Sequence, residues 1–119
     1  MSEIIFEPLH DVSDRISARQ LSPVEVTEAC LRQVELHGER LNPFITLTAD
    51  LALEMARQAE REIVAGDHRG PLHGIPVLLK DNVDTGDRML TTAGSLALAG
   101  RPAPRDAFLV ERLREAGAV

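Results

Sequence analysis

A short apolar run in the middle of the chain limits the fold most strongly. Residues 75–79 are all apolar, Pro76 lies near their start, and a Gly/Pro-punctuated loop at 66–74 precedes them. A run of this length is typical of a buried strand in a largely parallel sheet, where a proline is tolerated near the first residue. Because parallel strands are joined by helical crossovers, the run predicts an α/β fold.

Helical patterns flank this run on both sides. Ser22 and Glu25 have the spacing of a capping box around Pro23, which suits the first position of a helix, and Gly38 is the expected end of that helix. The elements expected over the chain are helices near 11–18, 23–37, 50–65 and 106–116, and strands near 44–47 and 75–80.

Two acidic residues and the last two residues complete this outline. Asp11 and Asp106 are the expected N-caps of the first and last helices. Ala118 and Val119 have the character of the opening of another strand, where a βαβ unit would return to its sheet. We therefore interpret residues 1–119 as the N-terminal part of a single larger domain.

Composition excludes several classes of protein. Thirteen Lys and Arg against nineteen Asp and Glu give a formal net charge of −6, whereas a nucleic-acid binder needs a surplus of cations. The N-terminus lacks the pattern of a signal peptide, and no apolar run approaches the length that spans a membrane. We expect a cytoplasmic protein with no nucleic-acid or membrane partner, and Cys30 as a small core residue.

The sequence also lacks the usual patterns of metal and phosphate sites. No pair among the four histidines has metal-ligand spacing with a carboxylate or cysteine partner, and the glycines at 66, 70 and 74 are not part of a phosphate-binding loop. We therefore expect neither a metal nor a cofactor. The histidines are His10, His37, His68 and His73.

Lys80 is the one lysine among thirteen basic residues, and it directly follows the apolar run. At the carboxyl end of a buried strand, an ammonium would be partly desolvated, and its pKa would fall below the free value of about 10.4. Three roles stay open from the residues alone. Lys80 could be a surface or ion-paired side chain beside Asp81 or Asp84, a general base for a hydroxyl nucleophile, or a Schiff-base lysine.

The segment around Lys80 resembles the amidase signature family in its N-terminal region. The resemblance rests on residues 70–82 (GPLHGIPVLLKDN) and 91–95 (TTAGS), with support from 21–27, 42–45 and 110–118, so it covers nearly the whole chain. It implies the amidase signature fold, an α/β architecture with helices around a mixed β-sheet, of which only the N-terminal portion is present. It also favours the general-base role for Lys80.

By this resemblance, Lys80 would be the base of a Ser-cisSer-Lys triad whose two serines lie beyond Val119. We therefore expect the 119-residue chain alone to be inactive and to self-associate as a homo-oligomer. The residues expected to support the site or bind substrate are Asp81, Asn82, Thr92, Gly94 and Ser95. Ser95 also fits the simpler role of a helix cap.

The implied reaction is hydrolysis of a small carboxylic amide to an acid plus ammonia or an amine. An alternative within the same fold is the glutaminase subunit of a tRNA-dependent amidotransferase, which would pass ammonia to a partner. An alternative of another class is a non-catalytic interaction module, whose exposed half-sheet would need a partner to cover it.

Overall fold

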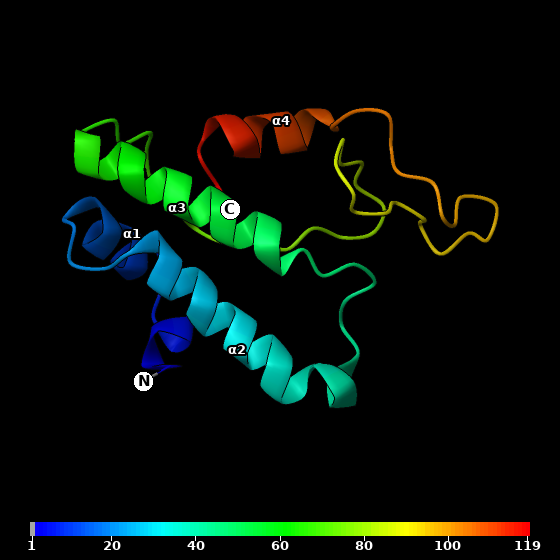
Figure 1. The fold of residues 1–119 in the computed structure, drawn as a ribbon, viewed down its shortest axis with the longest axis horizontal. Helices are drawn as coiled ribbons and strands as arrows, with labels where there is room; N and C mark the ends of the chain where they lie inside the picture. The colour runs from blue at the N-terminus through cyan, green and yellow to red at the C-terminus, as the bar shows by residue number, and fades with distance from the viewer. Residues whose placement is uncertain (1) are drawn as a thin grey trace.

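The computed structural model describes residues 2–119, and these form a helical body with one long projecting loop. Figure 1 shows α2 and α3 lying side by side, with α4 drawn above them in that view. The loop that precedes α4 extends away from the helices. The elements are a 3-10 helix η1 (Ser2–Phe6) and the helices α1 (Leu9–Ser17), α2 (Pro23–Leu41), α3 (Ala49–Ala65) and α4 (Phe108–Glu115).

The start of α2 is built by local hydrogen bonds. The Val24 N–H donates to Ser22 Oγ at 3.0 Å, and the Ser22 N–H donates to Glu25 Oε2 at 3.0 Å, which completes the capping box. The helix runs through Gly38 instead of ending there. It ends at Asn42, which has a φ of 44° and precedes Pro43, because a following proline disfavours helical backbone.

Neither Asp11 nor Asp106 caps a helix. Helix α1 already begins at Leu9, so Asp11 lies inside its first turn. Helix α4 begins at Phe108, and the Asp106 carboxylate instead accepts a hydrogen bond from the Gly86 N–H at 2.6 Å. Asp106 therefore binds the distant Gly86 N–H and no N–H group at the start of α4. The spacing of residues in the sequence does not predict this partner.

The core lies where α1, the start of α2 and the end of α3 meet. Ile16 is 1% exposed and is the most deeply buried side chain of the main apolar cluster. Where α2 packs on α3, the buried residues Ala29, Ala56 and Ala59 are small, which lets the two helices approach closely. The other members of the main cluster are Val12, Leu21, Val26, Ile63 and Ile75.

The strands predicted at 44–47 and 75–80 are not formed within residues 2–119. The reason is a shortage of neighbours, since a strand is stabilised by a ladder of bonds to another strand. Residues 75–77 pair only with Val119 in the described part of the chain. The Val119 N–H donates to Ile75 O at 2.9 Å, and the Val77 N–H donates to Val119 O at 2.8 Å. This alternation is the pattern of a parallel pair.

Gly74 joins this paired segment to the helices. Its φ of 78° lies in the left-handed region, and a Cβ there would come within 2.6 Å of Pro23 Cγ. The Gly74 N–H also donates to Gly117 O at 2.9 Å. The turn at Gly74 therefore lets the segment that leads to Lys80 pass close to the start of α2.

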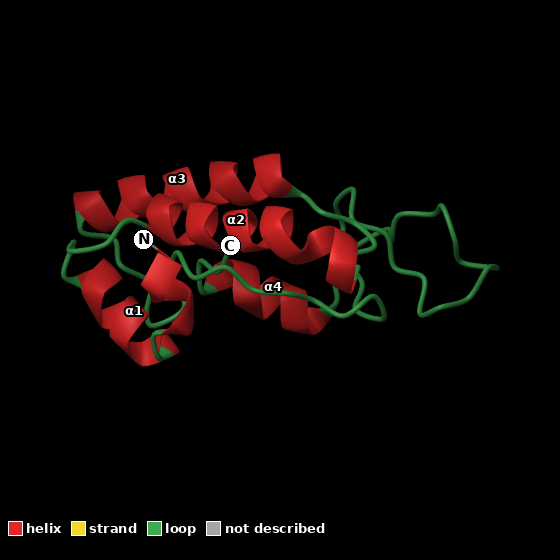
Figure 2. Ribbon diagram, turned by 90° about the horizontal axis from the view of Figure 1, so that it is seen from below, coloured by secondary structure: helices red, strands yellow, loops and turns green. Residues whose placement is uncertain are grey.

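The other face of the 76–79 segment borders an apolar hollow. Helices α2, α3 and α4 line it with side chains such as Val34, Met55 and Leu113, and residues of the loop between α2 and α3 line it as well. Cys30 lines the same hollow, and partial burial raises the pKa of its thiol. Figure 2 views these helices from another side.

Among residues 2–119, no helix combines the length and the apolar character that a membrane span requires.

Candidate functional site

Lys80 lies three residues after the paired Val77, at a turn in which the Val83 N–H donates to Lys80 O at 3.0 Å. Its side chain is exposed, so residues 2–119 do not provide the desolvation expected from the position of Lys80 in the sequence. Lys80 also borders a hollow whose walls are largely apolar, including Phe44, Leu79 and Met89. The amine is thus accessible and sits at the rim of this hollow.

Asp81 ties the turn at Lys80 to the Thr-Thr-Ala-Gly-Ser segment. Its carboxylate accepts the Thr92 hydroxyl and, at 3.1 Å, the Thr92 N–H. Its backbone oxygen accepts the N–H groups of Thr92 at 3.1 Å and Ala93 at 2.9 Å. Because these bonds join residues eleven or twelve positions apart, Asp81 holds two loops together instead of pairing with Lys80.

The segment that Asp81 holds is a tight turn. Ala93 and Gly94 both have positive φ values, 48° and 75°, and the Gly94 N–H donates to Thr92 Oγ1 at 3.2 Å. The Ser95 N–H donates to Thr92 O at 2.8 Å, but turns follow Ser95, so it does not cap a helix. Of the expected site residues, Asp81, Thr92, Gly94 and Ser95 are brought together, and Asn82 lies beside them in the turn after Lys80.

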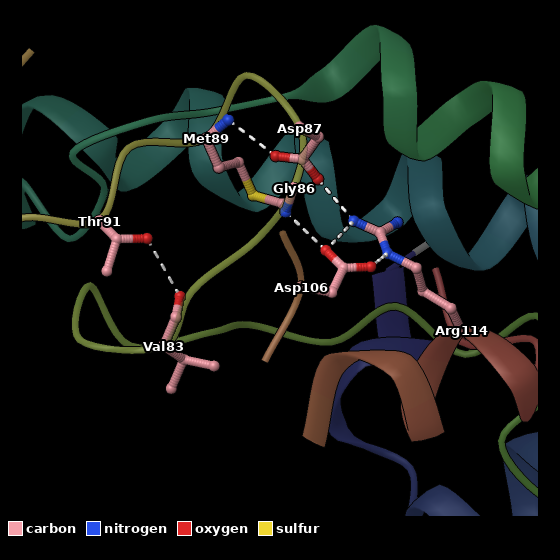
Figure 3. Close-up of polar contacts among 7 residues, drawn as sticks. All are labelled: Val83, Gly86, Asp87, Met89, Thr91, Asp106 and Arg114. Carbon is pink, nitrogen blue, oxygen red and sulfur yellow. Dashed lines mark hydrogen bonds and ion pairs between the residues drawn. The ribbon is translucent and has the colours of Figure 1, made fainter. Parts of the chain in front are cut away.

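A second set of polar contacts fastens the loop after Lys80 to α4 (Figure 3). Arg114 donates to Asp106 Oδ2 at 2.7 Å through Nε and to Asp87 Oδ2 at 2.6 Å through Nη2. Asp87 also accepts the Met89 N–H at 2.8 Å. The Gly86 N–H, followed by the Arg114 guanidinium, lowers the pKa of Asp106. These contacts, together with a bond from Thr91 Oγ1 to Val83 O, order the loop around residues 83–91.

His73 is a buried titratable residue that the sequence did not indicate as a site residue. Its side chain is fully buried, its Nδ1 accepts the Arg69 N–H at 3.1 Å, and its Nε2 lies 2.9 Å from Glu62 Oε2. Burial lowers the pKa of this imidazole, and the nearby Glu62 carboxylate partly opposes the shift. The only sequence signal is its place in a glycine-flanked turn, which does not distinguish a buried histidine from an exposed one.

No group of three or more histidine, cysteine or carboxylate side chains that could hold a metal ion occurs in the described part of the chain. The rings of His68 and His73 lie 5.8 Å apart between centroids.

The sequence also did not predict the contacts of Arg114 with Asp87 and Asp106, because these contacts join residues 27 and 8 positions apart.

Curated proteins related to this chain include A subunits of glutamyl-tRNA(Gln) amidotransferase. The chain is 37% identical over 117 residues to the A subunit of glutamyl-tRNA(Gln) amidotransferase from Carboxydothermus hydrogenoformans, covering 98% of the chain and 24% of the relative. It is 46% identical over 112 residues to the protein of the same name from Geobacter sulfurreducens, covering 93% of the chain and 22% of the relative. The chain therefore spans about a quarter of the length of these proteins.

A solved structure shows the same relationship in three dimensions. The native peptide amidase of Stenotrophomonas maltophilia matches 100% of the chain and 24% of its own length, with 43% identity and a TM-score of 0.90. The fold is thus the N-terminal portion of the amidase signature fold, as the resemblance implied. The Amidase family model matches residues 25–119. The chain accordingly belongs to the Amidase family.

Proposed function

We propose that the protein carrying this chain hydrolyses a carboxylic amide to an acid plus ammonia or an amine, with Lys80 as the general base. The observation that carries the proposal is the contact between the loop after Lys80 and the Thr-Thr-Ala-Gly-Ser segment. Asp81 makes that contact through both its carboxylate and its backbone oxygen. It supports a site in which the two segments by which the family is recognised lie next to each other.

The chemistry requires a neutral amine. Such an amine would take a proton from a bridging serine, which would in turn deprotonate the serine that attacks the amide carbon. Backbone N–H groups near that nucleophile would stabilise the developing oxyanion. Lys80 is exposed among residues 2–119, so we propose that the two serines and the burial of the amine come from the remainder of the protein.

Asp81, Thr92, Gly94 and Ser95 have a supporting role in this proposal. The Thr92 hydroxyl both donates to Asp81 and accepts the Gly94 N–H, so one side chain fixes the turn on two sides. Asn82 is exposed next to Lys80 and is available for a contact with substrate. The fixed turn would keep Lys80 at a constant distance from the bound amide.

The test is replacement of Lys80 in the full-length protein. Both Lys80→Ala and Lys80→Arg should reduce amide hydrolysis by about 10²- to 10⁴-fold, because neither side chain supplies a neutral amine. Release of ammonia or amine from a panel of primary and peptide amides measures the effect. Arg105→Ala removes an exposed cation and should leave turnover unchanged. Normal turnover in Lys80→Ala would remove the residue from the mechanism.

A second candidate function is supply of ammonia from glutamine within a tRNA-dependent amidotransferase. The curated relatives described above bear this name at 37% and 46% identity, whereas the solved peptide amidase is 43% identical. These similarities do not favour one over the other. Glutamine as the one amide that is hydrolysed, with stimulation by partner subunits, would support the amidotransferase; hydrolysis of peptide amides without a partner would support the amidase.

The remaining expectations stay predictions. Amidase family membership favours an enzyme over a non-catalytic interaction module. Self-association of the chain would place its apolar hollow against a second copy, and sedimentation of the isolated chain measures it. A cytoplasmic location is likewise a prediction, tested by fractionation of cells.

A further inference from the structure

The buried imidazole of His73 lies where three parts of the fold meet. Glu62 approaches it from α3, the Arg69 N–H approaches from the loop after α3, and Gly117 approaches from the end of α4. A Cβ at position 117 would come within 2.3 Å of His73 Cδ2, and Gly117 has a φ of 77°. The ring and Gly117 therefore fit together only because this position has no side chain.

This contact leads directly to the segment that carries Lys80. Gly74, the next residue after His73, donates its N–H to Gly117 O at 2.9 Å, and the pairing of Val77 and Ile75 with Val119 continues in the same register. Lys80 follows three residues after Val77. A shift of the ring against Gly117 would therefore be transmitted along a backbone that is hydrogen-bonded on one side only in the described structure.

We propose that His73 is a positioning residue whose neutral form fixes the contact with Gly117, and with it the register of the segment leading to Lys80. The proposal rests on the catalytic role proposed for Lys80. His73 does not touch the reacting atoms in this proposal and acts only through the backbone from 74 to 80.

In the described part of the chain, the one hydrogen bond to the ring, from the Arg69 N–H to Nδ1, defines which form of the ring fits. Because Nδ1 accepts the Arg69 N–H, it carries no proton, so the neutral ring has its proton on Nε2. A second proton would have to go on Nδ1, where it would face the Arg69 N–H and remove that bond. The imidazolium would also be a buried charge.

The charged and titratable groups around the ring act in opposite directions. The Glu62 carboxylate favours the imidazolium, whereas the Arg69 guanidinium and the His68 ring disfavour it. Arg114 on α4 and His73 line one hollow beside α3, and Arg69 Nη1 donates to the Arg114 backbone oxygen at 3.3 Å. Burial is the largest influence and keeps the pKa of His73 below its ordinary value.

The experiment measures protonation, backbone order and catalysis in the full-length protein. Hydrogen–deuterium exchange at the imidazole carbon, read by mass spectrometry, reports the titration of each histidine. Amide exchange of a peptide spanning 74–79 reports the pairing, normalised to a peptide from α2. We expect His73 to titrate below its ordinary pKa, and we expect amide exchange at 74–79 to become at least about tenfold faster as the ring is protonated.

Three variants separate a positioning role from a general loss of stability. His73→Gln should speed exchange at 74–79 at neutral pH, remove its pH dependence and lower kcat with little change in KM. Glu62→Gln should shift the titration of His73, and the loosening of 74–79, to lower pH, because it removes the charge that favours the imidazolium. His68→Gln, in which an exposed neighbouring ring is replaced, should leave the pairing intact.

Two results would overturn the proposal. One is exchange at 74–79 in His73→Gln that equals the wild type at every pH; the other is loosening in Glu62→Gln at unchanged or higher pH. If His73→Gln does not fold, the Glu62→Gln result decides. A wild-type protein without amide hydrolysis would overturn the proposed function, and the amide-exchange measurements would still decide whether His73 fixes the pairing.

Discussion

Two regions of this chain are held together in different ways. Residues 9–65 form three helices around a core of aliphatic side chains in which Ile16 is 1% exposed and Ala29 and Ala56 are 0% exposed. Residues 81–106 contain no helix, and their loops are held by carboxylates that bind backbone N–H groups and Arg114. Burial thus stabilises the first region, whereas a few polar contacts order the second.

This difference has a functional meaning within the proposed mechanism. Apolar burial stabilises a scaffold without fixing the position of any one polar group, because the hydrophobic effect is not directional. A hydrogen bond fixes distance and angle. The proposed site residues Asp81 and Thr92 belong to the second region, where the geometry of a loop is set by such directional contacts.

The largest expected effect tests the region that apolar burial stabilises, residues 9–65. Ile16→Ala should lower the free energy of unfolding by about 3 kcal/mol, because it removes a fully buried side chain and leaves a cavity between α1, α2 and α3. Urea denaturation followed by circular dichroism measures the change. Val64→Ala, at a position that is 60% exposed in α3, is the control and should cost less than about 0.5 kcal/mol. Equal losses in both variants would contradict the core described above.

The next effect tests the region that polar contacts order, residues 81–106. Asp106→Asn should cost about 2 kcal/mol, because it weakens the charge-assisted bonds to the Gly86 N–H and Arg114. Amide exchange should become faster at Gly86 and Met89, while the helical circular dichroism signal stays unchanged. Asp84→Asn, which changes an exposed carboxylate in the same loop, is the matched control. Loss of helix in Asp106→Asn would mean that the two regions do not differ as described.

The same carboxylate predicts a dependence on acid. The pKa of Asp106 is lower in the folded chain than its ordinary value of 3.8, chiefly through the Gly86 N–H. The contribution of the ionised Asp106 carboxylate to the free energy of unfolding is therefore complete above the pKa of the unfolded state. It is lost as the pH falls through the lower pKa of the folded state. The difference in unfolding free energy between wild type and Asp106→Asn should narrow below about pH 4. A difference that stays constant down to about pH 2 would contradict the assigned ionisation.

The smallest expected effect tests a local contact. Ser22→Ala should cost about 1 kcal/mol, because the Val24 N–H loses its acceptor at the start of α2. The unfolding midpoint in urea measures it. Ser17→Ala, at the exposed end of α1, provides a serine-to-alanine control that should have little effect. A cost at Ser22 as large as that of Ile16→Ala would show that α2 depends on its cap more than on its packing.

The parts of this structure that were predictable depend on neighbours along the chain. Ser22, Pro23 and Glu25 lie within four residues, and their order is sufficient to place the start of α2. Lys80 stood out because it is the one lysine and follows an apolar run, and the residues around it indicated the family. The strand predicted at 75–80 is not formed, because its apolar pattern suits a sheet but, in the described part of the chain, Ile75 and Val77 pair with Val119 alone.

Sequence alone determined the helix signals, the position of Lys80 and the family to which the chain belongs, because each depends on residue types at short, fixed spacings. Tertiary structure decided that Asp106 binds Gly86 instead of capping α4, that His73 is buried against Gly117, and that Lys80 is exposed. Each of these outcomes depends on which distant group competes for a carboxylate, a ring or a backbone N–H. That competition is settled only when the segments are packed together.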